Sequence, residues 1–389
     1  MGQNKPKLIF YIESNELGGC EKTTLSRVIG IERLGIPTGI ICSKRLELGA
    51  YQDAVSKLTL GCIKLPLKCR SEYPLSVFLP SLDFRQKNMV QEVLAQIRPD
   101  LFIVAQSGPE TCHSAMLAAA SLGIPIVAYV ALLVDQKTYP YKGRFLRYLW
   151  IKKHYRLCKR IITNCRKNVE ILRGLVSEKT PVDLVYNGIK SAEFPPCPSL
   201  GERQAARREM GILGDDWLIG IVGRLTVEKG HEWLISAFKE LLNIMPDAKL
   251  VIIGDGELYS KLKSKALILK DHVKFMGWRE DVSQLYWGFD VLVQPSLMES
   301  NPSTVLQAFS SRIPVIATNV HGIPDIIRDN ENGLLIEPFN IRSFNKAMCD
   351  IRNDERKRGE IINSAFKYVT KEADFNKQLN KFLECILQL

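Results

Sequence analysis

Short apolar runs alternate with amphipathic stretches along the whole chain of 389 residues. Six strand-like runs lie in the first half, at 7–12, 38–43, 100–106, 124–130, 160–164 and 182–187, and six in the second, at 217–223, 248–254, 273–277, 291–296, 315–319 and 333–338. Helical patterns lie between them, for example at 230–244 and 283–289. Apolar strands that alternate with helices form parallel sheets covered on both faces, so the sequence predicts an α/β fold of doubly wound sheets with right-handed crossovers.

A proline-rich break with little periodic apolar content falls between the two sets of strands. At about 100–200 residues per domain, the chain is long enough for two cores. We therefore predict an N-terminal Rossmann-like domain at 1–190, a linker at 191–214 and a second domain at 215–365. An amphipathic helix follows at 366–389, and either domain is available for its packing.

The composition indicates the cellular compartment and the chemical class of the partners. The ten cysteines form no CxxC pair and several lie in apolar runs, which favours buried free thiols in a reducing cytosol over disulfides or zinc. The apolar start at 8–12 is short and reads as a first strand rather than a secretion signal. We expect a cytoplasmic protein. Its net charge of +11 favours phosphates, anionic membrane surfaces or nucleic acid as partners.

Ligands of open parallel sheets bind at the carboxyl ends of the strands, and several loops there carry suitable residues. Gly18 and Gly19 precede a predicted helix, where a tight turn or an anion site would both fit. Gly223 and Arg224 end one strand, and Lys229 opens the next helix. Two cations at one strand-to-helix junction suit a diphosphate, although solvated surface cations would look the same.

The segment MESNPSTVLQAF, residues 298–309, places an acid at a strand end just before a helix. Glu299 could bind sugar hydroxyls. The residues Asn301, Pro302, Ser303 and Thr304 are types that begin helices, whose free N–H groups attract anions. Gln307 lies about one and a half turns into a regular helix and could reach a diol. Together with the glycine and cation loops, this pattern suits a nucleotide-activated sugar.

These segments resemble glycosyltransferase family 4. The resemblance rests on VGRLTVEKG, LVIIGDGE, VKFMGWREDVSQLYWGFDVLVQPSLMES, PSTVLQAFSSRIPVIATNVHGIPDII and NGLLIEP, which follow in register over roughly 216–338. The first half is more weakly similar, through GGCE at 18–21 and VYNGI at 185–189. The resemblance implies a retaining enzyme of GT-B fold, with two Rossmann-like domains whose parallel sheets face each other across a cleft, the first being the acceptor side.

The resemblance also implies roles for the matched positions. Arg224 and Lys229 would hold the donor diphosphate, and Glu299 would contact the transferred sugar, so these three are the expected catalytic residues. Gln307 takes the place of a second acid that usually binds the ribose. The expected donor-binding residues are Gly18, Gly19, Gly223, Gly277, Trp278, Arg279, Asn301, Pro302, Ser303, Thr304 and Gln307. The family usually needs no metal or other cofactor, and we expect none.

Three positions depart from the family pattern. Gln307 replaces an acid, and an amide still donates and accepts hydrogen bonds without charge assistance. Arg312 stands where glycine is common, which implies an altered turn or an added phosphate contact. Ala131 stands where a sugar-contacting histidine is customary. The departures at Ala131 and Gln307 keep a second hypothesis open, that of a nucleotide-sugar-binding protein with impaired catalysis.

A retaining transfer without an enzymic nucleophile can use the leaving diphosphate to accept the proton, so the loss of a histidine at Ala131 removes no base. The donor is expected to be a nucleotide-diphosphate sugar, and family frequency favours UDP. The acceptor would be a glycan, lipid-linked or other hydroxyl, as in the synthesis of surface polysaccharide or glycolipid.

The segment 141–160 carries eight basic residues, no acid and interleaved aromatic residues. It predicts a basic interfacial helix that would dock on an anionic membrane surface beside a lipid-linked acceptor. A solvated helix with a core-facing side is the plain alternative. An RNA acceptor is ranked lower, because the patch is single and no RNA-binding module is evident.

Overall fold

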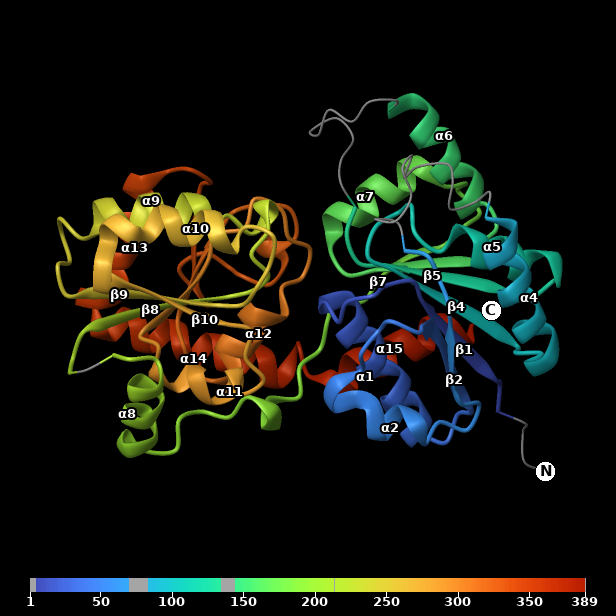
Figure 1. Ribbon diagram of the computed structural model, residues 1–389, viewed down its shortest axis with the longest axis horizontal. Helices are drawn as coiled ribbons and strands as arrows, with labels where there is room; N and C mark the ends of the chain where they lie inside the picture. Colours follow the sequence, from blue (N-terminus) through green and yellow to red (C-terminus); the bar gives the residue numbers. More distant parts are fainter. Residues whose placement is uncertain (1–4, 70–82, 134–143, 213, 389) are drawn as a thin grey trace. The chain divides into compact units, whose positions relative to one another are not determined.

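The computed structural model describes residues 5–69, 83–133, 144–212 and 214–388. The chain divides into two compact units, residues 1–186 with 378–389 and residues 187–377 (Figure 1). Each unit holds one parallel sheet, as the alternating pattern predicts. Residues 191–214, which the sequence reading takes as a linker, belong to the second unit and contain a helix.

The first unit contains a seven-stranded parallel sheet in the order β3-β2-β1-β4-β5-β6-β7. Its strands are β1 Leu8–Ile12, β2 Thr38–Ser43, β3 Cys62–Leu65, β4 Leu101–Gln106, β5 Ile126–Val130, β6 Arg160–Thr163 and β7 Val182–Leu184. Its helices are α1 Gly19–Arg33, η1 Gly49–Tyr51, α2 Gln52–Ser56, α4 Phe84–Ile97, α5 His113–Ser121, α6 Arg144–Tyr155 and α7 Arg166–Leu175.

The C-terminal helix α15, Phe375–Leu387, supplies its residues from Gln378 onward to the first unit. Phe382 is fully buried there, with its ring 6.4 Å from that of Phe10 and 6.3 Å from that of Tyr129. The guanidinium of Arg27, from α1, lies 4.6 Å from the Phe382 ring and 4.2 Å from the Tyr129 ring. These contacts hold the end of the chain against one face of the first sheet.

The second unit contains a six-stranded parallel sheet in the order β10-β9-β8-β11-β12-β13. Its strands are β8 Trp217–Val222, β9 Ala248–Ile253, β10 Val273–Gly277, β11 Val291–Gln294, β12 Val315–Thr318 and β13 Leu334–Ile336. Its helices are η3 Ser191–Glu193, α8 Leu200–Glu209, η4 Val227–Lys229, α9 His231–Leu241, α10 Tyr259–Ala266, η5 Leu267–His272, α11 Val282–Leu285, η6 Tyr286–Gly288, α12 Ser303–Ser310, η7 Ile323–Asp325, α13 Ile341–Asn353 and α14 Glu355–Lys371.

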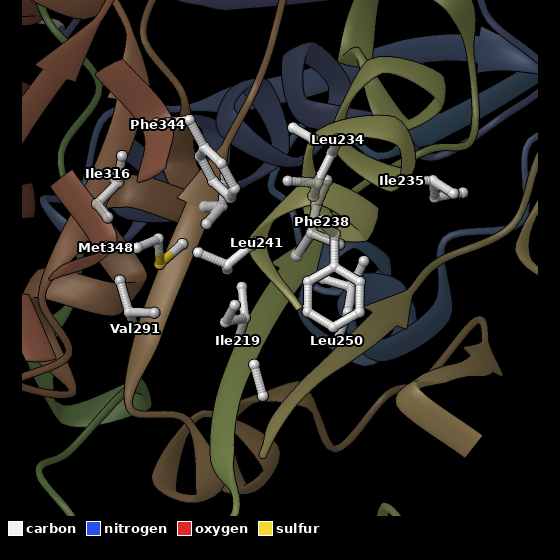
Figure 2. Packing of buried hydrophobic residues seen from close by; sticks show 14 of the residues in the cluster. Ile219, Leu234, Ile235, Phe238, Leu241, Leu250, Val291, Ile316, Phe344 and Met348 are labelled. Atoms are coloured by element: carbon white, nitrogen blue, oxygen red, sulfur yellow. The ribbon is translucent and has the colours of Figure 1, made fainter. Parts of the chain in front are cut away.

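Alternate residues of these strands enter two separate cores. Ile219, Leu250 and Val291 meet Phe238 and Phe344 on one face of the sheet, as Figure 2 shows. The residues between them on the strands pack on the other face, where α12 and α14 contribute Phe309 and Val369. Because both faces are apolar, the strands read as continuous apolar runs and the loops at their carboxyl ends are left for polar residues.

The strand order changes direction at one place in each sheet. In the first sheet β1 lies between β2 and β4, and in the second β8 lies between β9 and β11. The loops that leave two such neighbouring strands run to opposite faces, so a crevice opens between them at the carboxyl edge. The two switch points are therefore the expected ligand positions.

Candidate functional site

The switch point of the second sheet brings together the loops after β8 and β11. The 3-10 helix η4 follows β8, and the carbonyl of Glu228 in it accepts a hydrogen bond of 2.8 Å from the backbone N–H of Leu297, in the loop after β11. Gly230 ends η4 with a φ of +72°, and a Cβ there would lie 1.9 Å from the carbonyl oxygen of Pro295. Glycine is thus required for the two loops to touch.

This contact places Lys229 against Glu299. The Lys229 ammonium forms an ion pair with the Glu299 carboxylate, and the side chains keep 21% and 16% of their exposure. The Glu299 carbonyl accepts a hydrogen bond of 2.9 Å from the backbone N–H of Gly322, which fixes the acid at the strand end. The pair joins two of the three expected catalytic residues, and both side chains stay accessible enough to meet a ligand.

His231 follows this pair at the start of α9 and is buried. Burial, reinforced by the charge of Lys229, lowers the pKa of His231 to about 4. The imidazole is therefore neutral at neutral pH, and Lys229 supplies the positive charge at this helix start.

The loop after β8, which carries Gly223 and Arg224, packs against the loop after β9. A Cβ on Gly254, whose φ is +140°, would lie 1.9 Å from the carbonyl oxygen of Gly223. The N–H of Leu225 donates to the carbonyl of Asp255 at 2.9 Å. The Gly-Asp-Gly turn at 254–256 therefore holds the Arg224 loop in place through backbone contacts. The Arg224 side chain is exposed at the edge of the sheet.

The helix α12 begins beside Glu299, with Pro302 at its cap and Ser303 as its first residue. Thr304 donates a hydrogen bond of 2.7 Å from its hydroxyl to the Gln294 side chain of β11, which ties the helix start to the strand. The Tyr286 hydroxyl lies 3.2 Å from Oε1 of Gln307. Gln307 is half-buried, and its predicted contact with the donor stays a prediction.

Asn301 has protein partners that the sequence does not reveal. Its side-chain oxygen accepts a hydrogen bond of 3.1 Å from the backbone N–H of Asn187, and its carbonyl accepts one of 2.8 Å from the Asn187 amide. Asn301 is 4% exposed, and its Nδ2 atom has no partner among the described residues. The observed role of Asn301 is to anchor the VYNGI segment, and its predicted donor contact stays a prediction.

The segment Gly277–Arg279 ends β10 at the same edge of the sheet. Gly277 has a φ of +66° and its carbonyl accepts a hydrogen bond of 2.8 Å from the N–H of Gly254. Arg279 forms ion pairs of 2.6 Å with Asp281 and 3.0 Å with Glu209, and the hydrogen bonds from Arg279 lower the pKa of Asp281. Trp278 is 62% exposed. The Arg279 guanidinium is thus paired with two acids of the protein, and the donor contact predicted for Gly277, Trp278 and Arg279 stays a prediction.

Arg312 resolves one of the alternatives that its sequence position left open. Its φ is +59°, the left-handed conformation that glycine would adopt without strain. Its guanidinium lies 4.3 Å from the Phe366 ring and donates a hydrogen bond of 3.1 Å to Asn363, both on α14. Arg312 thus belongs to an altered turn that ties α12 to α14.

At the carboxyl edge of the first sheet, Gly18 and Gly19 lead into α1 as expected. A Cβ on Gly18 would lie 2.8 Å from a carboxylate oxygen of Glu21, which is 6% exposed, whereas Gly19 has open space around its Cα. A side chain at Gly18 would therefore displace the carboxylate of Glu21, a residue for which the sequence predicts no role. Ala131 follows β5 and its N–H donates to the Gln106 carbonyl at 2.9 Å.

Glu13, at the end of β1, is a buried acid that the sequence reading missed. It is 5% exposed and accepts hydrogen bonds of 3.1 Å from the Tyr11 hydroxyl and 3.1 Å from the Gln86 amide. Burial raises the pKa of Glu13 to about 7, against the opposing hydrogen bonds of Cys112, Tyr11 and Gln86. The carboxyl group is thus about half protonated at neutral pH.

This pKa predicts how stability changes with pH. Glu13 ionises near 4.5 in the unfolded chain and near 7 in the folded one. Its contribution is fully present below the unfolded pKa and is lost as pH rises through 7, which costs on the order of 3 kcal/mol. We expect Glu13→Gln to remove this loss, so that denaturant titrations show the variant gaining stability over the wild type between about pH 5 and about pH 8. Parallel curves for the two proteins would show that Glu13 does not titrate in this range.

The basic segment 141–160 is described only in part. Residues 141–143, with Lys142, lie outside the described residues, and of α6 the side chains are described from Tyr148 onward. Leu149 is 45% exposed, and the ammonium of Lys153 lies 5.4 Å from the Trp150 ring. His154 is buried and stacks on His113 of α5, with ring centroids 3.8 Å apart. The helix therefore has one anchored side and one side with exposed apolar and basic groups.

Two general features bear on ligands. Within the described ranges, no group of three or more His, Cys, Asp or Glu side chains is placed to hold a metal ion. Among the helices that the structure describes, none is long and apolar enough to cross a bilayer. The expected absence of a cofactor stays a prediction.

Two family models match the chain. The model described as Glycosyltransferase Family 4 matches residues 17–193, and the one described as Glycosyl transferases group 1 matches residues 202–368. The first range lies almost wholly in the first unit, and the second lies in the second unit. The matches therefore include the loops that carry Gly18, Arg224, Lys229 and Glu299.

Relatives whose names state an activity are similar over most of the chain. The UDP-Gal:alpha-D-GlcNAc-diphosphoundecaprenol alpha-1,3-galactosyltransferase of Escherichia coli is 28% identical over 346 residues, which are 87% of this chain and 86% of the relative. A GDP-mannose-dependent alpha-mannosyltransferase of Corynebacterium glutamicum is 27% identical over 83% of this chain and 73% of its own length.

Solved structures share the fold. The Anabaena protein HepE in complex with UDP-glucose aligns with a TM-score of 0.81 at 18% identity, covering 99% of this chain and 100% of that chain. WaaG, a glycosyltransferase involved in lipopolysaccharide biosynthesis, aligns with a TM-score of 0.74 at 18% identity, covering 96% and 98%. At these identities the alignments show the fold, with its two parallel-sheet domains.

Proposed function

The chain belongs to glycosyltransferase family 4 and has the GT-B fold, and from this premise we propose that it is a retaining enzyme that transfers a sugar from a UDP-sugar to a lipid-linked glycan. The observation that carries the proposal is the Lys229–Glu299 pair at the switch point of the second sheet. A diphosphate needs a cation and a sugar needs a hydrogen-bonding acid, and this pair offers both side by side. The name of the Escherichia coli relative supports both the UDP donor and the diphosphate-linked lipid acceptor.

The proposed reaction uses few groups of the protein. The bond between the sugar C1 and the donor phosphate oxygen breaks, and the acceptor hydroxyl forms a new bond to C1 on the same face. The acceptor proton passes to the leaving diphosphate, so the enzyme supplies no nucleophile. Lys229 and Arg224 stabilise the charge that develops on the diphosphate, and Glu299 orients the sugar.

The proposal is tested by transfer with the whole purified chain. UDP-galactose, UDP-glucose and GDP-mannose are each offered with a polyprenyl-diphosphate-linked N-acetylglucosamine, and the product is isolated and its anomeric configuration read by NMR. We expect one UDP-sugar to be used and its α-configuration to be kept. Inversion would refute the retaining mechanism, and donor binding without turnover would favour the impaired-enzyme alternative. Donor binding itself is read from the rise in melting temperature.

Gln307 offers a test of the ribose position. Its Oε1 atom is 3.2 Å from the Tyr286 hydroxyl, and a carboxylate at this position would accept the same hydrogen bond. We expect Gln307→Glu to bind UDP about 3- to 10-fold more tightly, because a carboxylate strengthens hydrogen bonds from ribose hydroxyls. Gln307→Leu, the control, should bind UDP more weakly. Titration calorimetry with UDP checks both, and equal affinities in all three proteins would exclude Gln307 from the site.

We propose that α6 docks on an anionic membrane surface. The support is the exposed Leu149 beside Trp150, Lys152 and Lys153. Leu149→Ser with Lys153→Glu should lower co-sedimentation with phosphatidylglycerol vesicles about tenfold or more, since it removes an apolar side chain and reverses a charge. Lys179→Glu, at another exposed lysine of the same unit, should change it little. Unchanged binding by the α6 variant would refute the docking.

A further inference from the structure

The segment α10–η5 of the second unit, Tyr259–His272, exposes two neighbouring apolar side chains. Leu267 is 71% exposed and Ile268 is 68% exposed, although single exposed apolar residues are ordinary. The core-facing side of the same segment is complete without them. Leu262, Ala266 and Leu269 are buried at helical spacing and belong to the same core cluster as Phe238 and Leu250. Leu267 and Ile268 therefore lie next to each other on the surface, outside the core.

Lysines flank the two apolar side chains along the chain. Lys263 lies four positions before Leu267 and Lys265 three before Ile268, so they share faces of the helical turn, and Lys270 follows two residues later. All three lysines are exposed. Lys265 lies 3.5 Å from Glu232, whereas Lys263 and Lys270 form no ion pair with a described carboxylate. Of the five lysines of 261–274, Lys261 and Lys265 pair with Glu232 and Lys274 pairs with Asp271. Lys263 and Lys270 are thus the basic side chains of the segment that no described carboxylate neutralises.

The chemistry of this patch favours one kind of partner. Protein interfaces are depleted in lysine and built around aromatic residues and arginine, and the patch has lysines around two aliphatic side chains. A pair of aliphatic side chains flanked by flexible lysines matches an anionic bilayer surface, where the apolar groups enter the boundary of the acyl chains and the lysines meet the headgroups. We infer that Leu267, Ile268 and their flanking lysines form a contact site for anionic lipid, separate from α6.

The patch and the donor site lie at different edges of the second sheet. The helix η5 precedes β10, so it lies at the amino end of that strand, whereas Lys229 and Glu299 lie at the carboxyl edge of the same sheet. A substitution in the patch touches no residue of the candidate site. The inference therefore stands or falls independently of the proposed transfer reaction.

The test is co-sedimentation of the whole chain with vesicles of phosphatidylcholine, alone or mixed with phosphatidylglycerol. We expect Leu267→Ser with Ile268→Ser to weaken binding to the mixed vesicles about tenfold, and Lys263→Glu with Lys270→Glu to weaken it at least as much. Ile244→Ser, at a 53% exposed residue of the same unit, is the matched control and should bind like the wild type. Both patch variants should keep the wild-type melting temperature and its rise with UDP.

Three outcomes would overturn the inference. Vesicle binding that is unchanged in both patch variants would remove the site, whatever the α6 variant does. Equal losses in the Ile244→Ser control would show that the effect is unspecific. A change in the sedimentation of the chain without vesicles, seen only in the Leu267→Ser and Ile268→Ser variant, would assign the patch to contact between protein chains.

Discussion

Lys229→Ala is expected to lower the rate of sugar transfer at least about a hundredfold while leaving the fold intact. The Lys229 ammonium pairs with Glu299. In the proposed reaction, the same ammonium would form an ion pair with the leaving diphosphate. Alanine removes the charge and leaves Glu299 beside the donor phosphates, where a like charge opposes binding. Steady-state transfer kinetics measure the loss, and circular dichroism and thermal unfolding check the fold.

A second lysine of the same unit provides the control for this variant. Lys261 pairs with Glu232 at 2.7 Å on the surface of α10, and its side chain is 61% exposed. Exposed pairs of this kind contribute little to stability, so Lys261→Ala should transfer sugar at nearly the wild-type rate. Near-normal turnover in Lys229→Ala would contradict the assignment of the diphosphate to this pair.

Gly230→Ala is expected to impair both stability and transfer without touching a ligand. A methyl group would meet the Pro295 carbonyl oxygen at 1.9 Å, and the backbone φ of +72° is strained for alanine. We expect a loss of about 2–4 kcal/mol in the free energy of unfolding, because η4 must move away from the loop after β11. That movement separates Lys229 from Glu299, so transfer should fall even where the protein is fully folded.

Gly211→Ala is a control that tests backbone strain without a steric clash. The φ of Gly211 is +70°, close to that of Gly230, but nothing lies within 4 Å of the position of a Cβ. Gly211→Ala should therefore cost only the strain, about 1–2 kcal/mol, and keep its activity. Denaturant titration and transfer kinetics on the two variants give the comparison. Equal losses of stability and activity in both would show that the Pro295 contact does not position Lys229.

Much of the fold could be predicted because its strands are apolar on both faces. Central strands such as β1 and β4 read directly as buried runs. The strand β3, Cys62–Leu65, was missed because it is a half-buried edge strand with a lysine inside it. The helix α8 was also missed, since it packs through ion pairs of Arg203 and Arg207 with Asp290 rather than through an apolar stripe.

The candidate site was predictable where residue types and strand ends coincide, as for Lys229 and Glu299. Contacts between residues distant in the sequence were not predictable. No local pattern indicates that Asn301 bonds to Asn187 or that the Arg224 loop packs against Gly254. Glu13 also follows a predicted strand, but nothing in the sequence indicates that its carboxyl group is buried. Its raised pKa comes from burial beside the Gln86 side chain of α4 and the backbone of Cys112 at the start of α5, which only the folded chain brings together.

The most direct test of the central proposal is a crystal structure of the chain with a bound UDP-sugar. We predict that diphosphate oxygens lie within about 3 Å of the Lys229 ammonium, that the sugar lies beside Glu299, and that the ribose lies near Gln307. A diphosphate bound elsewhere, with the Lys229–Glu299 pair intact and away from the ligand, would contradict the account.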